Sequence, residues 1–460
     1  MRIVEDLRAE LGDRIVTEPQ VLQAMRTDRS GWVGPGTPAV LVRAASVADV
    51  QAVMRLASVH RVPVVPRGAG TGLAGGAIGT EGAIVLDLSG MRRVLEVDVQ
   101  NEVAVVEPGI VTDDLAAVLA EHELWWPPDP ASRAISTVGG NIATNAGGLL
   151  CAKYGVTRES VLGLRVVLAD GTLIGVGRRT VKGVAGYDLT ALMVGSEGTL
   201  GVVVEATLKL RRISRDPVVT IGATFPDVIA AAAAAAAITA SGLRPAALEL
   251  MDAATCTAID DLLQPSAEYP VLAGRGAFLL VRTDSAAAAD EAALAARLIR
   301  HAGGEPEVST DALTGERLMQ VRRSAHPAYA RLGEVLIEDV AVPRSALPAM
   351  FAATERIGAS HGIPIPTIAH AGDGNLHPNL VVPPHLAGEP GHIPDVVWSA
   401  ADELFHEAIA LGGTLTGEHG VGILKRRWLA DELGGDVFAL SERLKAAFDP
   451  LNILNPGKVL

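Results

Sequence analysis

Two histidines in a segment rich in glycine and asparagine are the residues best suited to carry chemistry. His370 and His377 lie in Ile368–Asn379 with six residues between them, so their imidazoles converge only if the segment folds back on itself. Glu418, in a second glycine-rich segment, adds a carboxylate. Two imidazoles and one carboxylate leave open positions on a Zn²⁺-like or Mn²⁺-like ion. The alternative is that these histidines form hydrogen bonds to the backbone and nothing more.

A glycine-rich loop nearer the N-terminus is a candidate phosphate site. Val65–Gly76 follows a short apolar run, Val62–Val65, that is typical of a buried strand. Glycines let the backbone approach a ligand and turn its N–H groups toward an anion, and Arg67 adds a positive charge. A glycine-rich surface turn is the alternative. The loop holds five glycines in nine residues: Gly68, Gly70, Gly72, Gly75 and Gly76.

The same loop carries a dinucleotide-binding fingerprint in the wrong context. Gly70–Gly75 matches G-x-G-x-x-G, which needs a helix directly after the loop so that the pyrophosphate lies at the helix N-terminus. Here Gly79 and Gly82 follow, and then a strand-like run, Ala83–Leu88. The sequence therefore predicts a phosphate-binding loop outside a Rossmann unit.

Two other glycine-rich segments stand out, and the first of them is suited to lie along a cofactor. Pro127–Gly148 has too many Gly, Asn and Thr residues for a regular element, yet it is apolar enough to be buried. A buried loop must pair its backbone polar groups, and a large polar cofactor lying along it would do so. Val194–Val203 reads as a glycine-rich entry to a strand, with Glu197 placed to accept hydrogen bonds.

Length, charge and cysteine content exclude several classes of protein. A chain of 460 residues, 49% of them hydrophobic, predicts two or three domains. A formal net charge of −14 argues against nucleic acid as the main partner. No apolar run reaches about 18 residues, and the charged N-terminus does not resemble a signal peptide. Cys151 and Cys256 form no C-x-x-C pair, so we expect small buried fillers and no iron–sulfur cluster.

The first half of the chain contains regular elements that position these loops. Apolar residues at helical spacing predict helices over Ser46–His60 and Thr112–His122, each capped by its first residue. Alternating apolar residues predict hairpins over Val94–Glu107 and Leu164–Val176.

The composition changes near residue 214, where alanine-rich helices replace the glycine motifs. A helix with eight consecutive alanines has side chains so small that it must pack close against a sheet. Helices that alternate with antiparallel-looking strands predict a separate α+β domain. The expected helices are Asp227–Ala240, Ser285–His301 and Glu403–Leu411, and the expected strands are Ala277–Arg282 and Glu334–Val342. The tail, Phe448–Lys458, is a run of turns that we expect to pack on the first domain.

Taken together, the motifs resemble those of the PCMH-type FAD flavoproteins of the vanillyl-alcohol-oxidase family. Within that family, the chain is most similar to D-lactate dehydrogenases, the large catalytic subunit of glycolate oxidase and D-2-hydroxyglutarate dehydrogenase. Agreement of several spaced motifs is more specific than any single one. The motifs occur in family order: Pro66–Gly72, Ser136–Asn141, Gly186–Leu189, Gly195–Gly201, His370–His377, Gly417–Gly420 and Asn455–Lys458.

The resemblance implies an α+β fold in four parts. An N-terminal helical lead-in, 1–36, would precede a PCMH-type FAD-binding domain of two subdomains, 37–213. A substrate-binding cap, 214–413, would contain an antiparallel sheet flanked by helices. The C-terminal segment, 414–460, would return to the flavin.

The same resemblance implies where FAD would lie. Arg67–Leu73 would cradle the pyrophosphate, Ser136–Gly148 would line the ribityl chain and ring, and Glu197–Val202 would lie near the adenosine. Some relatives bond the flavin through a histidine in the phosphate loop, which is absent here, so we expect non-covalent FAD. The implied cofactor residues are Pro66, Arg67, Gly68, Ala69, Gly70, Thr71, Gly72, Leu73, Pro128, Ser136, Thr137, Gly139, Gly140, Asn141, Ala143, Asn145, Gly147, Gly148, Glu197, Gly198, Gly201, Val202 and Asn455.

For the reaction, the resemblance implies an FAD-dependent dehydrogenase that oxidises a D-2-hydroxy acid to the 2-oxo acid by transferring a hydride to flavin N5. His370, His377 and Glu418 would hold a divalent metal, Zn or Mn, which lowers the pKa of the substrate hydroxyl. His419 would take the hydroxyl proton as the catalytic base.

Arg322 and Asn375 are the implied substrate-binding residues. The guanidinium of Arg322 would grip the substrate carboxylate with two parallel hydrogen bonds. Its neighbour Arg323 is an alternative residue for binding the carboxylate. A further alternative is that both arginines belong to a solvated basic patch on a helix and bind no substrate. Met319 stands where the family usually has tryptophan.

A second departure bears on the substrate. The 2-hydroxyglutarate enzymes carry a lysine for the second carboxylate where this chain has Ile337, followed by Glu338 and Asp339. A second carboxylate would be repelled there, which favours D-lactate or glycolate. The alternatives are a D-2-hydroxyglutarate dehydrogenase, a sugar-acid oxidase of the same fold, a non-catalytic flavin subunit and a metal-dependent hydrolase without flavin.

The expected partners are the small 2-hydroxy acid and an electron acceptor, which would be a quinone, an electron-transfer flavoprotein or an iron–sulfur protein. We expect no nucleic acid and no transmembrane segment. The expected location is the cytoplasm, with peripheral attachment at the inner membrane left open.

Overall fold

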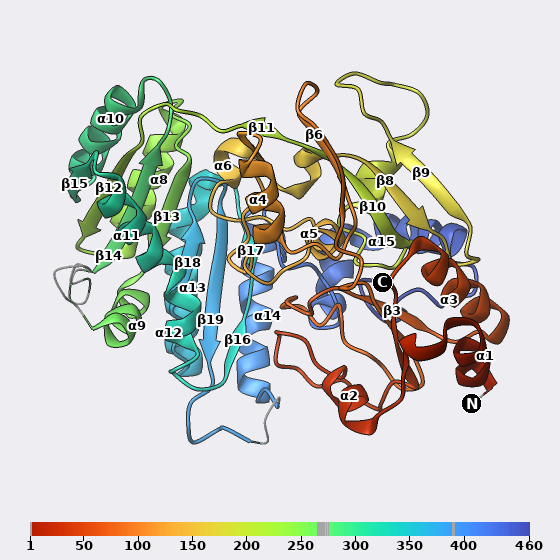
Figure 1. The fold of residues 1–460 in the computed structure, drawn as a ribbon. Coiled ribbons are helices and arrows are strands. Elements are labelled where there is room, and N and C mark those ends of the chain that lie inside the picture. Colours follow the sequence, from red (N-terminus) through yellow and green to blue (C-terminus); the bar gives the residue numbers. More distant parts are fainter. Residues whose placement is uncertain (1, 265–271, 273, 275, 389–391) are drawn as a thin grey trace. The chain divides into compact units, whose positions relative to one another are not determined.

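The structure is a computed structural model of the chain, and it describes residues 2–264, 272, 274, 276–388 and 392–460. Contacts divide the chain into two compact units (Figure 1). Unit 1 comprises the chain up to Gly147, Gly155–Ile213 and Glu418–Leu460, and unit 2 comprises Gly148–Tyr154 and Ser214–Gly417. Residues 265–271, 273, 275 and 389–391 of the expected cap, 214–413, lie outside the described residues. No helix within the described ranges combines the length and apolar character needed to cross a bilayer.

The first part of unit 1 is a four-stranded sheet with the strand order β1-β2-β4-β3. Strands β2, β3 and β4 are parallel, and β1 pairs antiparallel with β2. Residues 68–83, all described, contain no helix, so the glycine-rich loop is the whole connection from β3 to β4, as predicted. The strands are β1 Ile15–Val16, β2 Val40–Arg43, β3 Val64–Arg67 and β4 Ile84–Asp87, with helices α1 Arg2–Leu11, η1 Gly12–Arg14, α2 Pro19–Ala24 and α3 Val47–His60.

The second part of unit 1 is a five-stranded antiparallel sheet with the order β5-β6-β10-β8-β9. Both predicted hairpins are confirmed as its edges. The strands are β5 Val94–Asp98, β6 Val103–Val106, β8 Val161–Val167, β9 Leu173–Gly177 and β10 Val202–Lys209, with a separate pair β7 Leu124–Trp125 and β11 Arg211–Arg212. The helices are α4 Thr112–Ala120, α5 Val138–Thr144, η2 Thr157–Ser160, α7 Leu189–Met193, η4 Arg426–Trp428 and α15 Leu429–Phe448.

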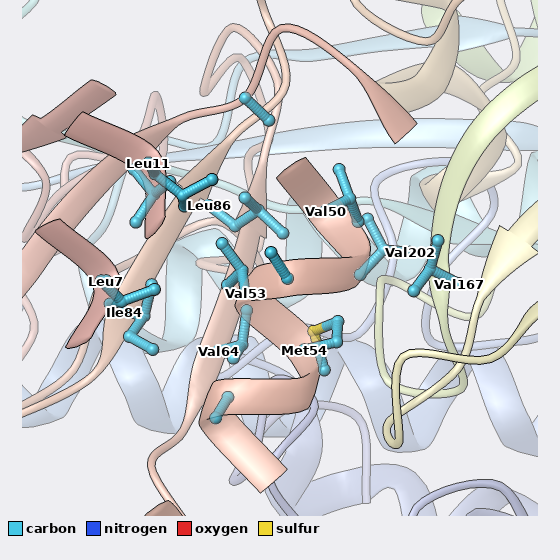
Figure 2. Packing of buried hydrophobic residues seen from close by; sticks show 14 of the residues in the cluster. Leu7, Leu11, Val50, Val53, Met54, Val64, Ile84, Leu86, Val167 and Val202 are labelled. Atoms are coloured by element: carbon cyan, nitrogen blue, oxygen red, sulfur yellow. The ribbon is translucent and has the colours of Figure 1, made fainter. Parts of the chain in front are cut away.

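One apolar core joins the two sheets of unit 1. Helix α3 begins where Ser46 predicts it, because the Ser46 Oγ accepts a hydrogen bond from the N–H of Asp49. Figure 2 shows side chains from α1, α3, β3, β4, β8 and β10 packed together: Leu7, Leu11, Val50, Val53, Met54, Val64, Ile84, Leu86, Val167 and Val202. Burying each such side chain stabilises the fold by roughly 1.5–3 kcal/mol.

Two predictions about unit 1 are wrong. Thr112 is the first residue of α4 and does not cap it. Its hydroxyl instead donates to the carbonyl oxygen of Ser136 and accepts from the Asn141 side chain, at 3.2 and 2.9 Å. The segment Pro127–Gly148 is not wholly irregular, because Val138–Thr144 forms α5 behind an N-cap hydrogen bond to Thr137. That cap offsets the low helix propensity of two adjacent glycines.

Unit 2 is built on one antiparallel sheet, as the α+β prediction requires. The order is β15-β12-β14-β13-β18-β19-β16, and β17 also pairs with β19. The strands are β12 Val219–Phe225, β13 Ala247–Met251, β14 Ala277–Thr283, β15 Glu305–Ser309, β16 Val335–Ile337, β17 Val340–Ala341, β18 Thr367–His370 and β19 Asn375–Val381.

Helices flank the sheet of unit 2. The alanine-rich α8 contacts β12, β13 and β14 and also packs against α10 and α13 (Figure 1). Asp227 caps it, and its small side chains allow this close approach on several sides. The helices are α6 Cys151–Tyr154, α8 Val228–Ala240, α9 Ala253–Leu263, α10 Ala288–His301, α11 Ala312–Arg323, α12 Ala325–Tyr329, η3 Arg344–Ala346, α13 Leu347–His361 and α14 Asp395–Ala410.

The strand expected over Glu334–Val342 is interrupted. Strands β16 and β17 both pair with β19, but Glu338 and Asp339 lie between them. Proline 378 on β19 has no N–H to donate, so the ladder breaks opposite it, and the Glu338 N–H bonds the Pro378 carbonyl oxygen at 3.0 Å. The break leaves both acidic side chains inside unit 2, with exposed fractions of 1% and 0%.

Candidate functional site

The two candidate metal-binding histidines lie on one face of a hairpin in unit 2. A four-residue turn joins β18 to β19, so that His370 pairs with Asn375 and Ile368 pairs with His377. Opposite residues share a face, which makes the two histidines diagonal neighbours. Their ring centroids are 5.1 Å apart, and the rings are nearly perpendicular, at 88°. The turn closes through Gly374, whose φ of +91° favours glycine.

Glu249 joins His370 to Arg322 in the interior of unit 2. Its Oε1 lies 2.8 Å from the His370 Nδ1, and its Oε2 accepts a hydrogen bond from the Arg322 Nε at 2.7 Å. The exposed fractions of Glu249, His370 and Arg322 are 1%, 5% and 3%. A carboxylate only accepts hydrogen bonds, so the His370 Nδ1 carries a proton in this contact.

Arg322 is not part of a solvated basic patch. It lies in the last turn of α11 and is buried, whereas the side chain of Arg323 is 34% exposed and lies 3.9 Å from Glu316. Within the described residues, neither terminal Nη atom of Arg322 forms a hydrogen bond. The guanidinium is therefore held at Nε with its fork available to a carboxylate. Met319 packs in the core of unit 2.

An acidic pair lies beside His377. The Asp339 Oδ1 is 3.7 Å from the His377 Nδ1, and the Asp339 Oδ2 accepts a hydrogen bond from the Thr416 hydroxyl at 2.8 Å. Glu338 is equally buried.

Two asparagines complete this face of β19. Asn375 and Asn379 are 7% and 0% exposed, and their Oδ1 atoms accept no hydrogen bond from any residue that the structure describes. The Asn379 Nδ2 donates to the carbonyl oxygens of Pro366 and His377. Buried amide oxygens normally have donors, so the Asn375 oxygen is suited to accept a hydrogen bond from a bound hydroxyl.

Sequence reasoning missed two residues of this cluster, Glu249 and Thr416, and treated Asp339 only as a source of repulsion. A signal for Glu249 was present, because it is the one charged residue in the apolar strand Ala247–Met251. Its partners lie 73 and 121 residues away, however, and no local pattern links them.

The glycine-rich loop of unit 1 has the properties of an anion cradle. In the described chain, the backbone N–H groups of residues 68–76 donate no hydrogen bond. Gly70 has a φ of +70°, and a Cβ there would lie 2.3 Å from the Arg67 Nη2. A Cβ on Gly68 would lie 2.4 Å from the Thr137 Oγ1. The loop thus combines backbone N–H groups that donate no hydrogen bond in the described chain, several glycines and one guanidinium group. This combination is suited to bind a diphosphate.

A buried charged cluster ties this loop to the C-terminal tail. The Asn455 Nδ2 donates to the carbonyl oxygens of Gly76 and Glu197, at 3.0 and 2.8 Å. The Lys458 Nζ donates to the Ile78 carbonyl oxygen and the Asn455 Oδ1, at 2.5 and 2.7 Å. The polar atoms of Asn455, one of the implied cofactor residues, thus form hydrogen bonds within the protein.

Glu197 also connects the first part of unit 1 to the C-terminal segment. Its two carboxylate oxygens accept hydrogen bonds from the N–H groups of Val421 and Gly422, at 2.7 and 2.9 Å. Burial raises the pKa of Glu197 to about 7. Those two hydrogen bonds and the charges of Lys425 and Lys458 act in the opposite direction and lower this pKa. Burial lowers the pKa of Lys458 to about 7.

The helix α5 supplies much of the predicted cofactor segment. Its first amides are already used, because the N–H groups of Val138 and Gly139 donate to the carbonyl oxygens of Ile110 and Pro108. Ser136, Asn141 and Thr112 form one buried hydrogen-bonded group. The other expected FAD residues belong to unit 1, except Gly148, which begins the 148–154 segment of unit 2.

The last two predicted site residues, Glu418 and His419, belong to unit 1. A Cβ on Gly147 would lie 2.4 Å from the Glu418 Oε2, so a larger residue at 147 would displace this carboxylate. The His419 Nε2 lies 4.0 Å from the Glu418 Oε1. His370, His377, Asn375 and Arg322 belong to unit 2.

The pH dependence of stability provides a test of the charged cluster in unit 1. The folded protein holds a proton on Glu197 that the unfolded chain loses above pH 4.5, so this group's contribution falls as the pH rises from about 4.5 to 7. The lowered pKa of Lys458 has the opposite effect, and its contribution rises from about pH 7 to 10.5. We expect Glu197→Gln to reduce the loss of stability between pH 4.5 and 7 by about 3 kcal/mol, measured by urea unfolding from pH 4.5 to 9. Lys458→Met should flatten the alkaline limb, and an unchanged profile for both variants would contradict the assignment.

The fold and the loops define a class of protein, a flavoprotein with a PCMH-type FAD-binding part and a second α+β part. Residues 38–177 match the family described as FAD binding domain, and residues 215–459 match the family described as FAD linked oxidases, C-terminal domain. The chain belongs to the FAD-linked oxidases.

Similar proteins of known name cover nearly the whole chain. It is 42% identical over 426 residues to the glycolate oxidase subunit GlcD of Bacillus subtilis, which spans 92% of this chain and 89% of that protein. It is 34% identical to a probable mitochondrial D-lactate dehydrogenase of Danio rerio, over 100% and 92% of the two chains. It is 32% identical to a D-lactate dehydrogenase of Anaerostipes hadrus, over 99% and 97%.

Solved structures confirm the predicted fold class. p-Cresol methylhydroxylase superimposes with a TM-score of 0.80 at 18% identity, covering 100% of this chain and 96% of that chain. The 4-ethylphenol oxidase of Gulosibacter chungangensis superimposes with a TM-score of 0.76 at 16% identity, over 100% and 96%. At such identities the likeness concerns the fold alone.

Proposed function

We propose that this chain is an FAD-dependent dehydrogenase that oxidises a small D-2-hydroxy monocarboxylate, D-lactate or glycolate, to the 2-oxo acid. The observation that carries the proposal is the buried chain Arg322–Glu249–His370, which places a carboxylate-binding fork and an oriented imidazole in one interior. The names of the glycolate oxidase subunit and the D-lactate dehydrogenases to which the chain is similar support the same class of substrate.

In this proposal, unit 1 would hold FAD without a covalent bond, and FAD bound there would supply the hydride-accepting chemistry for oxidation at the substrate Cα. The amides of residues 68–76 hold the diphosphate, with Arg67 beside them, and the α5 segment lies along the rest of the cofactor. The loop contains no histidine that could form the covalent link. Acid precipitation of the yellow protein should therefore leave the flavin in the supernatant.

Unit 2 is proposed to present the substrate. The Nη atoms of Arg322 bind the substrate carboxylate, and the Asn375 Oδ1 accepts a hydrogen bond from the substrate hydroxyl. The donor set of His370 and His377 suits Zn²⁺ or Mn²⁺, with Glu418 as a further ligand, and such a cation would lower the pKa of that hydroxyl. His419 is the proposed base that takes the hydroxyl proton.

The acidic pair restricts the substrate. Glu338 and Asp339 are buried, and Asp339 lies 3.7 Å from His377. A dicarboxylate such as D-2-hydroxyglutarate carries a second carboxylate, which the 2-hydroxyglutarate enzymes would pair with a lysine. This chain has Ile337 at that position, followed by the carboxyl groups of Glu338 and Asp339. We therefore expect monocarboxylates to be preferred.

The experiment is a dye-reduction screen of D- and L-2-hydroxy acids with the purified yellow protein. We expect D-lactate or glycolate to reduce the dye, L-lactate to react at least about tenfold more slowly, and EDTA to remove most of the activity, because the substrate hydroxyl would lose its cation. Zn²⁺ or Mn²⁺ should restore the rate. Absence of turnover with every D-2-hydroxy acid would overturn the substrate class. Unchanged turnover after verified metal removal would overturn the role of the cation.

A further inference from the structure

We propose that Glu249 is a positioning residue whose carboxylate fixes the tautomer of His370 and, at the same time, aims Arg322. This inference rests on the proposed function, in which His370 binds a cation and Arg322 binds the substrate carboxylate. Glu249 touches neither ligand, so its effect passes through the two side chains that do.

The strand register places Glu249 for this task. Glu249 on β13 pairs with His370 on β18, and His370 pairs with Asn375 on β19. Directly opposite residues point to the same face of a sheet, so the three side chains form a row across three strands. Arg322 approaches the end of this row from α11 and reaches the Glu249 Oε2.

The two oxygens of Glu249 are divided between two donors. Oε1 faces the His370 Nδ1 at 2.8 Å, and Oε2 faces the Arg322 Nε at 2.7 Å. The first contact requires a proton on Nδ1, which makes Nε2 the nitrogen that can bind a cation. The second contact fixes the plane of the guanidinium, so that Nη1 and Nη2 are presented as a fork. The Glu249 carboxylate therefore sets the protonated nitrogen of the His370 ring and the orientation of the Arg322 guanidinium.

An amide cannot do the same work, although it has the same shape. In Glu249→Gln, the amide oxygen is needed to accept from the Arg322 Nε, since arginine only donates. The amide NH₂ then faces His370 and requires a lone pair on Nδ1, which moves the ring proton to Nε2. The variant keeps two hydrogen bonds but reverses the direction of one, and it would block the proposed cation-binding nitrogen.

The test compares the wild-type protein with Glu249→Gln in two measurements. Nitrogen-15 NMR of histidine-labelled protein, without added metal, reports the His370 tautomer, and His370→Gln assigns the signal. Titration with Mn²⁺ reports cation affinity. We expect a change from the Nδ1–H to the Nε2–H tautomer and a 10–100-fold loss of Mn²⁺ affinity. Glu307→Gln, an exposed glutamate on β15 of the same sheet, is the matched control and should change neither quantity.

The two measurements separate this inference from the proposed function. If wild-type protein binds no divalent cation, the proposed cation fails, but the tautomer still tests Glu249. An unchanged tautomer in Glu249→Gln would overturn the inference, as would a changed tautomer with undiminished Mn²⁺ affinity. If Glu249→Gln does not fold, Glu249→Asp retains the charge and should keep the Nδ1–H tautomer; loss of that tautomer would equally overturn the inference.

Discussion

Replacing Arg322 with methionine is expected to lower the free energy of unfolding by about 3–5 kcal/mol, because the Glu249 carboxylate would stay buried without its cationic partner. Both side chains are almost fully buried, at 3% and 1% side-chain exposure, so water does not replace the lost contact. The same change should reduce kcat/KM for D-lactate at least about 30-fold, because truncating a buried charged hydrogen-bonding partner costs about 2–5 kcal/mol. Urea unfolding and dye-reduction kinetics measure the two effects.

A double variant separates the two effects. Arg322→Met combined with Glu249→Gln removes the buried charge together with its partner, so we expect most of the lost stability to return while activity stays low. Arg323→Met is the matched control, because this neighbour is 34% exposed and lies 3.9 Å from Glu316. It should change stability by less than about 1 kcal/mol and leave kcat/KM unchanged. A larger loss of activity in Arg323→Met than in Arg322→Met would assign the substrate carboxylate to Arg323.

The elements that the sequence predicts well are those set by neighbouring residues. The hairpins β5–β6 and β8–β9 have their turn and alternating pattern within one short segment. Ser46 caps the helix that follows it because its side chain reaches the N–H of Asp49, three residues on. Thr112 shows the limit of this reasoning. A partner 24 residues away, Ser136, takes its hydroxyl, and no local rule anticipates that competition.

The same distinction applies to the candidate site. The spacing of His370 and His377 requires a fold-back, and the turn through Gly374 provides it. Glu249 joins them only through the pairing of β13 with β18, which brings together residues 121 positions apart. Sequence reasoning therefore finds the candidate ligand-binding side chains, which occur in motifs, more readily than the buried groups that contact them.

Substituting Gly422 with alanine is expected to weaken FAD binding by about 10–100-fold, because the new side chain would displace the phosphate loop. Gly422 has a φ of +51°, and a Cβ there would lie 1.9 Å from the carbonyl oxygen of Ala74. That carbonyl cannot move freely, since it accepts hydrogen bonds from the N–H groups of Ile423 and Leu424, at 3.0 and 3.2 Å. Relief of the clash must therefore shift the loop residues whose amides are proposed to hold the diphosphate, and misplaced donors bind weakly.

Gly82 offers a matched control at the other end of the same loop. Its φ is +69°, but a Cβ there would meet nothing within 4 Å. Gly82→Ala therefore carries the left-handed backbone cost of about 1–2 kcal/mol without the clash, and it should retain FAD. Titration of each apoprotein with FAD, followed by the quenching of flavin fluorescence, measures the difference. Equal FAD affinity in the two variants would mean that backbone strain, not displacement of the loop at Ala74, governs cofactor binding.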